Sequence, residues 1–370
     1  MIQYIDIDAS NIDSFGFFTF VKYQYVLTYE GLKKRYKVKE PFEKGASYTT
    51  ADRTEQVSTG KITLTAGGVG RNIADAISRL RLSKGEDPTN TYFIGSVGND
   101  EAGQLLLQSL KHVNTESVFM LDEYSTACYA ARLEVADSAL AGVIHDARIH
   151  AALSPEKMYK CENIIAGSSF VIFDGNLSVK TIDTLVEICH RNKITSWFEP
   201  TDWNIISKPF IKPLGRVVDF ISPNLRELQI LAEHLTGKSR DKTVSNRSLE
   251  AILTEARDCA VHVLPFVPNI MVTLGKNGLI MVNEEKATYY EAVERHNVDH
   301  VYGVGDCTVA GFIVAFLNGL PEVQCVSVGM NAALQSLKSS QTIPETLSYQ
   351  LVTETLPKHF QLPLTGKIKL

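Results

Sequence analysis

The chain has 370 residues, of which 44% are hydrophobic and 21% are charged, an ordinary balance for a globular protein. Its 37 lysines and arginines against 42 aspartates and glutamates give a formal net charge of −5, which indicates neither a nucleic-acid partner nor a membrane surface. Six scattered cysteines without a CxxC pair argue against a zinc site and a disulfide framework. With no basic leader and no apolar run of about 18–20 residues, the expected location is the cytoplasm.

From about residue 60 onward, short apolar runs alternate with stretches of helical periodicity. Strands are predicted at residues 92–95, 170–173, 220–222 and 270–273. Amphipathic helices are predicted at residues 72–82, 100–111, 179–192, 225–235 and 248–260. This alternation predicts an α/β fold with a doubly wound, mostly parallel sheet and helices on both faces.

Two segments, residues 14–66 and residues 126–150, do not follow this alternation and are polar or strand-like instead. Together they are predicted to form a small β-sheet lid. The expected organisation is therefore an N-terminal strand and lid segment at residues 1–66 and an α/β domain at residues 67–370, with further lid strands near 126–150.

The strongest chemical signal is Gly303-Val304-Gly305-Asp306, which is followed by an apolar helical run. Glycines before a helix leave backbone N–H groups unpaired at its positive end, and such an end binds anions. A carboxylate in that turn could take a proton from a hydroxyl that attacks phosphorus. The alternative is an ordinary glycine turn in which Asp306 caps the helix.

A second glycine cluster, Gly67-Gly68-Val69-Gly70-Arg71-Asn72, opens another predicted helix. It allows close approach of a ligand to the backbone, and Asn72 offers a donor and an acceptor to a hydroxyl. A dinucleotide loop is not supported, because no GxGxxG with a following acidic strand end is present.

Two further motifs follow predicted strands. Asn224 and Glu227, three residues apart at a helix start, are oxygen ligands suited to Mg²⁺, although a helix cap with a capping-box acid explains them equally well. Thr273-Leu274-Gly275-Lys276-Asn277-Gly278 is suited to hold nucleotide phosphates.

These motifs, together with residues 95–103 and in this order, resemble the ribokinase-like (PfkB) family of sugar and nucleoside kinases over residues 60–345. The resemblance implies an ATP-dependent kinase that uses Mg²⁺, with Asp306 as catalytic base and the backbone of Gly303, Val304 and Gly305 stabilising charge. Residues 67–74 look most like pseudouridine kinases, which implies phosphorylation of the 5′-hydroxyl of pseudouridine.

The resemblance also assigns the other ligand contacts. The substrate-binding residues it implies are Asn11, Asp13, Gly67, Gly68, Asn72, Asp174 and Asn176. The nucleotide-binding residues are Asn224, Thr273, Gly275, Gly278 and Asn331, and the metal ligands are Asn224 and Glu227. Relatives that pair their lids suggest a homodimer.

The chain departs from the family pattern at several places. Asp8 stands where glycine is usual before Asn11-x-Asp13, and 54 positions separate Asp13 from Gly67. His300 replaces the usual acid or amide near the catalytic loop, which argues against the family's monovalent-cation site. Another ribose or nucleoside kinase, or a non-catalytic nucleoside-binding relative, remains an alternative.

Overall fold

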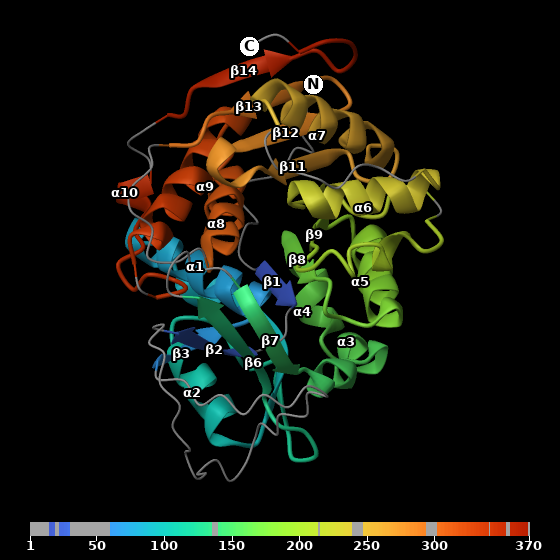
Figure 1. The fold of residues 1–370 in the computed structure, drawn as a ribbon. Helices are drawn as coiled ribbons and strands as arrows, with labels where there is room; N and C mark the ends of the chain where they lie inside the picture. Colours follow the sequence, from blue (N-terminus) through green and yellow to red (C-terminus); the bar gives the residue numbers. More distant parts are fainter. Residues whose placement is uncertain are drawn as a thin grey trace, which may run out of the picture.

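The computed structural model describes residues 15–18, 22–29, 60–134, 140–213, 215–238, 247–293, 302–339, 341–352 and 356–368. A ten-stranded central sheet organises them (Figure 1). Its strands are, in chain order, β1 (Phe15–Phe18), β4 (Thr91–Gly98), β5 (Val118–Leu121), β8 (Phe170–Asp174), β9 (Thr195–Glu199), β10 (Phe220–Ile221), β11 (Asn269–Thr273), β12 (Leu279–Asn283), β13 (Ala287–Tyr290) and β14 (His359–Leu362).

The strands lie in the order β14-β13-β12-β11-β10-β9-β8-β1-β4-β5. Those from β11 to β5 are parallel, and β12, β13 and β14 extend one edge in antiparallel fashion. The prediction of a mostly parallel sheet is therefore confirmed. Its carboxyl ends meet at a single edge, which is where ligands bind in open α/β sheets.

Helices cover both faces of this sheet because both faces of its strands are apolar. In β8, Phe170 and Ile172 pack toward one face and Val171 and Phe173 toward the other. The first face is covered by α1 (Val69–Lys84), α2 (Glu101–Ser109), α8 (Val304–Leu317), α9 (Glu322–Leu337) and α10 (Tyr349–Val352). The second is covered by α3 (Pro155–Lys160), α4 (Glu162–Ala166), α5 (Val179–Asn192), α6 (Leu225–Thr236) and α7 (Leu249–Val263).

Local signals in the sequence account for several helix ends. Asp100, Ser178 and Ser248 each accept a hydrogen bond from a backbone N–H in the first turn of α2, α5 and α7. Helix α1 ends at Gly85, which has φ of 84°, a left-handed conformation that glycine adopts without strain.

A separate four-stranded sheet forms the predicted lid and lies beside the carboxyl edge of the central sheet (Figure 1). It contains β2 (Lys22–Tyr29), β3 (Gly60–Gly67), β6 (Ala127–Glu134) and β7 (Leu140–Asp146) in the order β3-β2-β6-β7. Strand β2 pairs antiparallel with β3 and parallel with β6, and β6 pairs antiparallel with β7.

The N-terminal segment is divided between the two sheets rather than confined to the lid. Strand β1 lies in the central sheet between β4 and β8, parallel to both. Its sequence, Phe-Gly-Phe-Phe, suits a strand enclosed by neighbours on both sides. The lid segment proper thus begins with β2, and β3 leads directly into α1.

The strand end and turn at residues 95–103 anchor the lid to the central sheet. The carboxylate of Asp100 accepts hydrogen bonds from the backbone N–H of Thr126 at 2.8 Å and from its hydroxyl at 2.6 Å. The Thr126 hydroxyl oxygen accepts from the N–H of Gly98 at 2.9 Å. Because Thr126 directly precedes β6, these bonds hold the base of the lid strand against the end of β4.

Candidate active site

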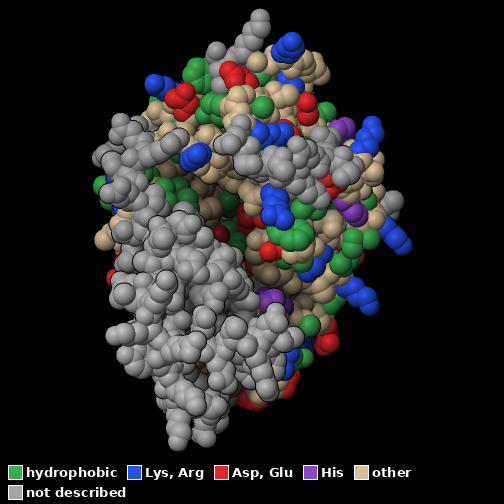
Figure 2. All heavy atoms as spheres, viewed as in Figure 1, with side chains coloured by type: hydrophobic (Ala, Val, Ile, Leu, Met, Phe, Trp, Pro, Cys, Tyr) green, Lys and Arg blue, Asp and Glu red, His purple; other side chains and the backbone are tan. Residues whose placement is uncertain are grey.

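The predicted polar residues gather at the carboxyl edge of the central sheet. Asp174 is the last residue of β8, Glu199 the last of β9 and Thr273 the last of β11, while Asn224 follows β10 and begins α6. These strands are neighbours in the sheet. Figure 2 shows a hollow near the middle of this face with acidic atoms inside it.

The two glycine motifs meet through a side-chain hydrogen bond. The Asn72 Nδ2 atom donates to Oδ2 of Asp306 at 2.8 Å, although the residues are 234 positions apart in the sequence. Asn72 lies in the first turn of α1 and is buried, and Asp306 lies in the first turn of α8. A group suited to bind a hydroxyl therefore lies beside a carboxylate suited to deprotonate one.

Glycine is required at both helix starts for steric reasons. Gly68 precedes α1 with φ of 104°, and its carbonyl accepts from the N–H of Asn72 at 2.8 Å. Gly303 precedes α8 with φ of 79°, and a Cβ there would lie 2.1 Å from the carbonyl oxygen of Thr342. A Cβ at Gly305 would meet no atom of the described residues within 4 Å, so this position is open toward that part of the chain.

Asp306 does not act as the helix cap that the alternative interpretation required. Gly303 occupies the N-cap of α8, where no side chain caps the helix, and the carboxylate of Asp306 accepts from Asn72 instead. Burial raises the pKa of Asp306 to about 7, although the hydrogen bond from Asn72 and the charge of Arg71 oppose the rise. A carboxylate with this pKa is well matched to proton transfer near neutral pH.

Other carboxyl groups share this edge and influence one another. Burial raises the pKa of Glu199 well above its ordinary value, and the charges of Glu227, Asp306 and Asp174 raise it further. The Ser222 hydroxyl donates to Glu199 and accepts from Nε1 of Trp197 at 2.6 Å. The edge thus brings several carboxyl groups together in a poorly hydrated place, where burial and mutual repulsion disfavour their charged forms and a bound cation would favour them.

Asn224 and Glu227 form the capping box that was the alternative to a metal site. The backbone N–H of Asn224 donates to Oε2 of Glu227 at 2.9 Å, and the N–H of Glu227 donates to Oδ1 of Asn224 at 3.0 Å. Burial raises the pKa of Glu227 to about 7. The second carboxylate oxygen of Glu227 takes no part in this box.

In the described part of the chain, no three His, Cys, Asp or Glu side chains are arranged to hold a metal ion directly. The acidic edge nevertheless fits Mg²⁺, because Mg²⁺ usually keeps several waters and binds proteins through one or two carboxylates together with substrate phosphates. Asn224 and Glu227 as metal ligands remain a prediction.

The loop after β8 is a tight turn built on Asp174. Its Oδ1 accepts from the backbone N–H of Asn176 at 2.9 Å and from the Asn176 side chain at 3.1 Å. Lys208, which sequence reasoning missed, holds the same loop: its Nζ donates to the carbonyls of Gly175 and Leu177, both at 2.8 Å. No local pattern could reveal Lys208, because its partners lie about 30 residues earlier and are backbone atoms.

The predicted nucleotide loop follows β11 and contacts the start of α6. The N–H of Thr273 donates to the carbonyl of Pro223 at 3.0 Å, which joins this loop to the residue before Asn224. Gly275 has φ of 57°, and a Cβ there would meet nothing within 4 Å. A Cβ at Gly278 would lie 2.1 Å from the carbonyl oxygen of Tyr290, so glycine is required there for packing.

Asn331, the remaining nucleotide-binding candidate, is buried in α9, and its Nδ2 donates to the carbonyl of Ser327 at 2.9 Å. Helices α8 and α9 are packed closely: a Cβ at Gly311 would lie 2.8 Å from the carbonyl oxygen of Val328. This close packing fixes the position of α8 against α9.

The lid contributes a tyrosine near the same edge. Burial raises the pKa of Tyr129 in β6, and the nearby Tyr302 and Asp202 raise it further. Tyr302 directly precedes Gly303, and Asp202 lies shortly after β9. The lid strand β6 therefore approaches the residues beside the Gly303 turn.

Asn11, Asp13 and His300 lie outside the described residues. The first two precede β1, whose carboxyl end is at Phe18. Their assignment to the sugar site stays a prediction.

Among the residues that the structure describes, no helix is long and apolar enough to cross a membrane. Residues 45–347 match the pfkB family of carbohydrate kinases. The chain is 22% identical over 340 residues to a pseudouridine kinase of Arabidopsis thaliana, covering 80% of this chain and 87% of the relative. It is 22% identical over 292 residues to a pseudouridine kinase of Escherichia coli, covering 78% and 85%.

Among solved structures, an Arabidopsis thaliana ribokinase complexed with ribose and ATP superposes with a TM-score of 0.71 at 18% identity, covering 92% of this chain and 97% of that one. This similarity shows that the fold is ribokinase-like. Because the family match extends over most of the sequence, the chain belongs to the pfkB family of carbohydrate kinases and is an ATP-dependent kinase of a sugar or nucleoside.

Proposed function

We propose that this kinase transfers the γ-phosphate of ATP to the 5′-hydroxyl of pseudouridine. The contact between Asn72 and Asp306 carries the proposal, because it places a hydroxyl-binding amide 2.8 Å from a carboxylate whose pKa is raised to about 7. The choice of pseudouridine rests on the similarity of residues 67–74 to pseudouridine kinases and on the two relatives with that name.

On the acceptor side, Asn72 and the backbone of Gly67 and Gly68 bind the ribosyl hydroxyls, with Asp174 and Asn176 at the adjoining strand end. Asp306 takes the proton of the 5′-hydroxyl as that oxygen forms its bond to the γ-phosphorus. The bond between the γ-phosphorus and its bridging oxygen breaks, and the electron pair leaves with ADP. Asn11 and Asp13 complete the acceptor site in this proposal.

On the phosphate side, the backbone N–H groups of residues 303–306 stabilise charge on the transferring oxygens. These donors lie at the positive end of α8, where a Cβ at Gly305 would meet no atom of the described residues within 4 Å. Asn224 and Glu227 would hold Mg²⁺, directly or through water. When bound, Mg²⁺ neutralises the phosphate charge that the acidic edge would otherwise repel.

On the nucleotide side, Thr273, Gly275 and Gly278 form the loop that holds ATP, with Asn224 at its border. Asn331 lies in α9, behind the start of α8, and lines the adenine pocket in this proposal. The open position of Gly275 leaves space for a phosphate or ribose against the backbone.

The test is ADP release by the purified protein with ATP, Mg²⁺ and a panel of pseudouridine, uridine, inosine, guanosine, ribose and fructose 6-phosphate. We expect the highest kcat/KM with pseudouridine and a product whose mass is that of pseudouridine plus one phosphate. A higher kcat/KM with another compound would show that pseudouridine is not the preferred substrate, and the proposed phosphoryl transfer would still stand. No turnover with any of them would favour a nucleoside-binding relative without catalysis.

The proposed homodimer is tested separately by light scattering of the same preparation. A molar mass close to that of one chain would exclude a dimer under those conditions.

A further inference from the structure

A network of charged and polar side chains lies behind Asn72, on the first turns of α1. Arg71 donates from Nη1 to Oδ1 of Asn72 at 3.0 Å and from Nη2 to Oδ2 of Asp75 at 2.8 Å. Its Nη2 also donates to the hydroxyl of Ser109, at the end of α2, at 3.0 Å. Arg71 and Asp75 are only 3% and 1% exposed, so this ion pair is almost completely buried.

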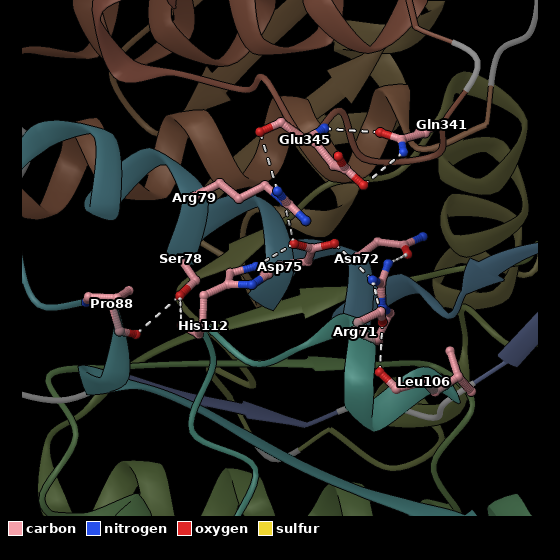
Figure 3. Close-up of polar contacts among 11 residues, drawn as sticks. Arg71, Asn72, Asp75, Ser78, Arg79, Pro88, Leu106, His112, Gln341 and Glu345 are labelled. Atoms are coloured by element: carbon pink, nitrogen blue, oxygen red, sulfur yellow. Dashed lines mark hydrogen bonds and ion pairs between the residues drawn. The ribbon is translucent and has the colours of Figure 1, made fainter. Parts of the chain in front are cut away.

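Asp75 holds Arg71 in this position and is itself held from the other side. Its second oxygen, Oδ1, contacts Nε of Arg79 and Nε2 of His112, both at 2.6 Å. Figure 3 shows Arg71 and Arg79 of α1, and His112 from the segment after α2, directed at the Asp75 carboxylate. Arg71 is therefore the member of the network that lies between Asp75 and the Asn72 amide.

The hydrogen-bonding capacities of these groups allow only one orientation of the Asn72 amide. A guanidinium has donors alone and a carboxylate has acceptors alone, whereas a side-chain amide has one end of each kind. With Arg71 on one side and the ionised carboxylate of Asp306 on the other, the amide oxygen must face Arg71 and the amide nitrogen must face Asp306. A rotated amide would place donor against donor and acceptor against acceptor.

Stability alone does not explain a buried arginine at this position. Replacing a buried ion pair with packed apolar residues is often neutral or stabilising, because removing both charges from water is costly. The two terminal nitrogens of Arg71, however, contact Asn72 and Asp75 at the same time, and a planar guanidinium suits such a double contact.

We propose that Arg71 is a positioning residue for phosphoryl transfer: it fixes the Asn72 amide so that its nitrogen faces Asp306 and holds the base toward the acceptor hydroxyl. The proposal rests on the proposed role of Asp306 as the base. Arg71 touches neither substrate nor nucleotide in this role and acts through Asn72.

The test is a double-mutant cycle of Arg71→Met and Asn72→Ala, measured with ATP and the compound of the panel that is turned over fastest. Arg71→Met should lower kcat by about 10- to 100-fold, the scale on which misplaced reacting groups reduce turnover, and leave the KM for ATP unchanged. In the Asn72→Ala background, the same change should lower kcat by less than about twofold, because the group through which Arg71 acts is gone.

Arg79→Met is the matched control, because Arg79 contacts the same carboxylate at its other oxygen and does not contact Asn72. It should lower the melting temperature comparably and change kcat by less than about twofold, since His112 still holds Asp75. If Arg71→Met does not fold, Arg71→Lys keeps a positive charge beside Asp75 but loses the planar guanidinium, and it should show the same loss of kcat.

Three results would overturn the proposal. The first is a double variant in which the kcat losses of Arg71→Met and Asn72→Ala multiply. The others are a loss of kcat in Arg79→Met equal to that in Arg71→Met, and full kcat in Arg71→Lys. Asp306→Asn separates this inference from the proposed function. If Asp306→Asn retains full turnover, or if no compound of the panel is phosphorylated, the mechanism itself fails and the role of Arg71 fails with it. If Asp306→Asn is inactive and the cycle is multiplicative, only the role of Arg71 fails.

Discussion

Replacing Asp306 with asparagine removes the proposed base and changes little else. The new side chain has nearly the same size, and its amide oxygen can still accept from Nδ2 of Asn72, the contact that is 2.8 Å long. General-base catalysis typically contributes about 10²- to 10⁴-fold to the rate. We therefore expect Asp306→Asn to lower kcat by at least about 10²-fold while ATP still binds.

The same change should alter stability in a direction that depends on pH. Burial raises the pKa of Asp306 from 3.8 to about 7, which corresponds to about 4 kcal/mol of cost for the charged form. Between pH 4 and pH 7 the folded protein keeps a proton that the unfolded chain has lost, so this group reduces stability progressively as the pH rises. Asn cannot ionise, and the variant should gain stability over the wild type between those values.

Turnover and melting temperature are measured on one preparation, at pH 5 and pH 8. The expected outcome is an inactive variant whose melting temperature relative to the wild type is higher at pH 8 than at pH 5. For the wild type, kcat/KM should rise with pH through about 7, as Asp306 loses its proton. A stable Asp306→Asn variant with full turnover would refute the assignment of Asp306 as the base. If the difference in melting temperature between variant and wild type were the same at pH 5 and pH 8, the cost of the buried Asp306 charge would be refuted.

Other substitutions test the rest of the site. Glu227→Gln keeps a residue that can complete a capping box, so it should leave stability almost unchanged and raise the Mg²⁺ concentration needed for half-maximal activity; an unchanged Mg²⁺ dependence would exclude Glu227 as a ligand. Asn72→Ala should raise the KM for the acceptor roughly tenfold and that for ATP far less, and equal effects on both would make Asn72 structural. Gly303→Ala places a Cβ 2.1 Å from the carbonyl oxygen of Thr342 and should lower the melting temperature, whereas the Cβ of Gly305→Ala meets none of the described atoms within 4 Å and should lower only kcat. Thermal unfolding with steady-state kinetics distinguishes the last two, and a Gly305→Ala variant with full kcat would show that no phosphate lies against that turn.

The sequence alone determined the fold class and the identity of most candidate residues. Helix α5 was predicted at its observed bounds, because its apolar periodicity and the cap at Ser178 act over a few residues. The glycine turns before α1 and α8 could be found for the same reason: a backbone conformation that requires glycine leaves a local mark in the sequence.

Which of these residues lie side by side depends on the tertiary structure. The bond between Asn72 and Asp306 joins two turns 234 residues apart, and Lys208 binds backbone carbonyls that have no sequence signature. Strand β1 could not be predicted from local signals, unlike α5. Its four residues have little pattern of their own, and they form a strand of the central sheet through pairing with β4 and β8. Local propensities are set by neighbours along the chain, whereas the pKa of Asp306 and the orientation of Asn72 depend on charges and donors that folding brings together.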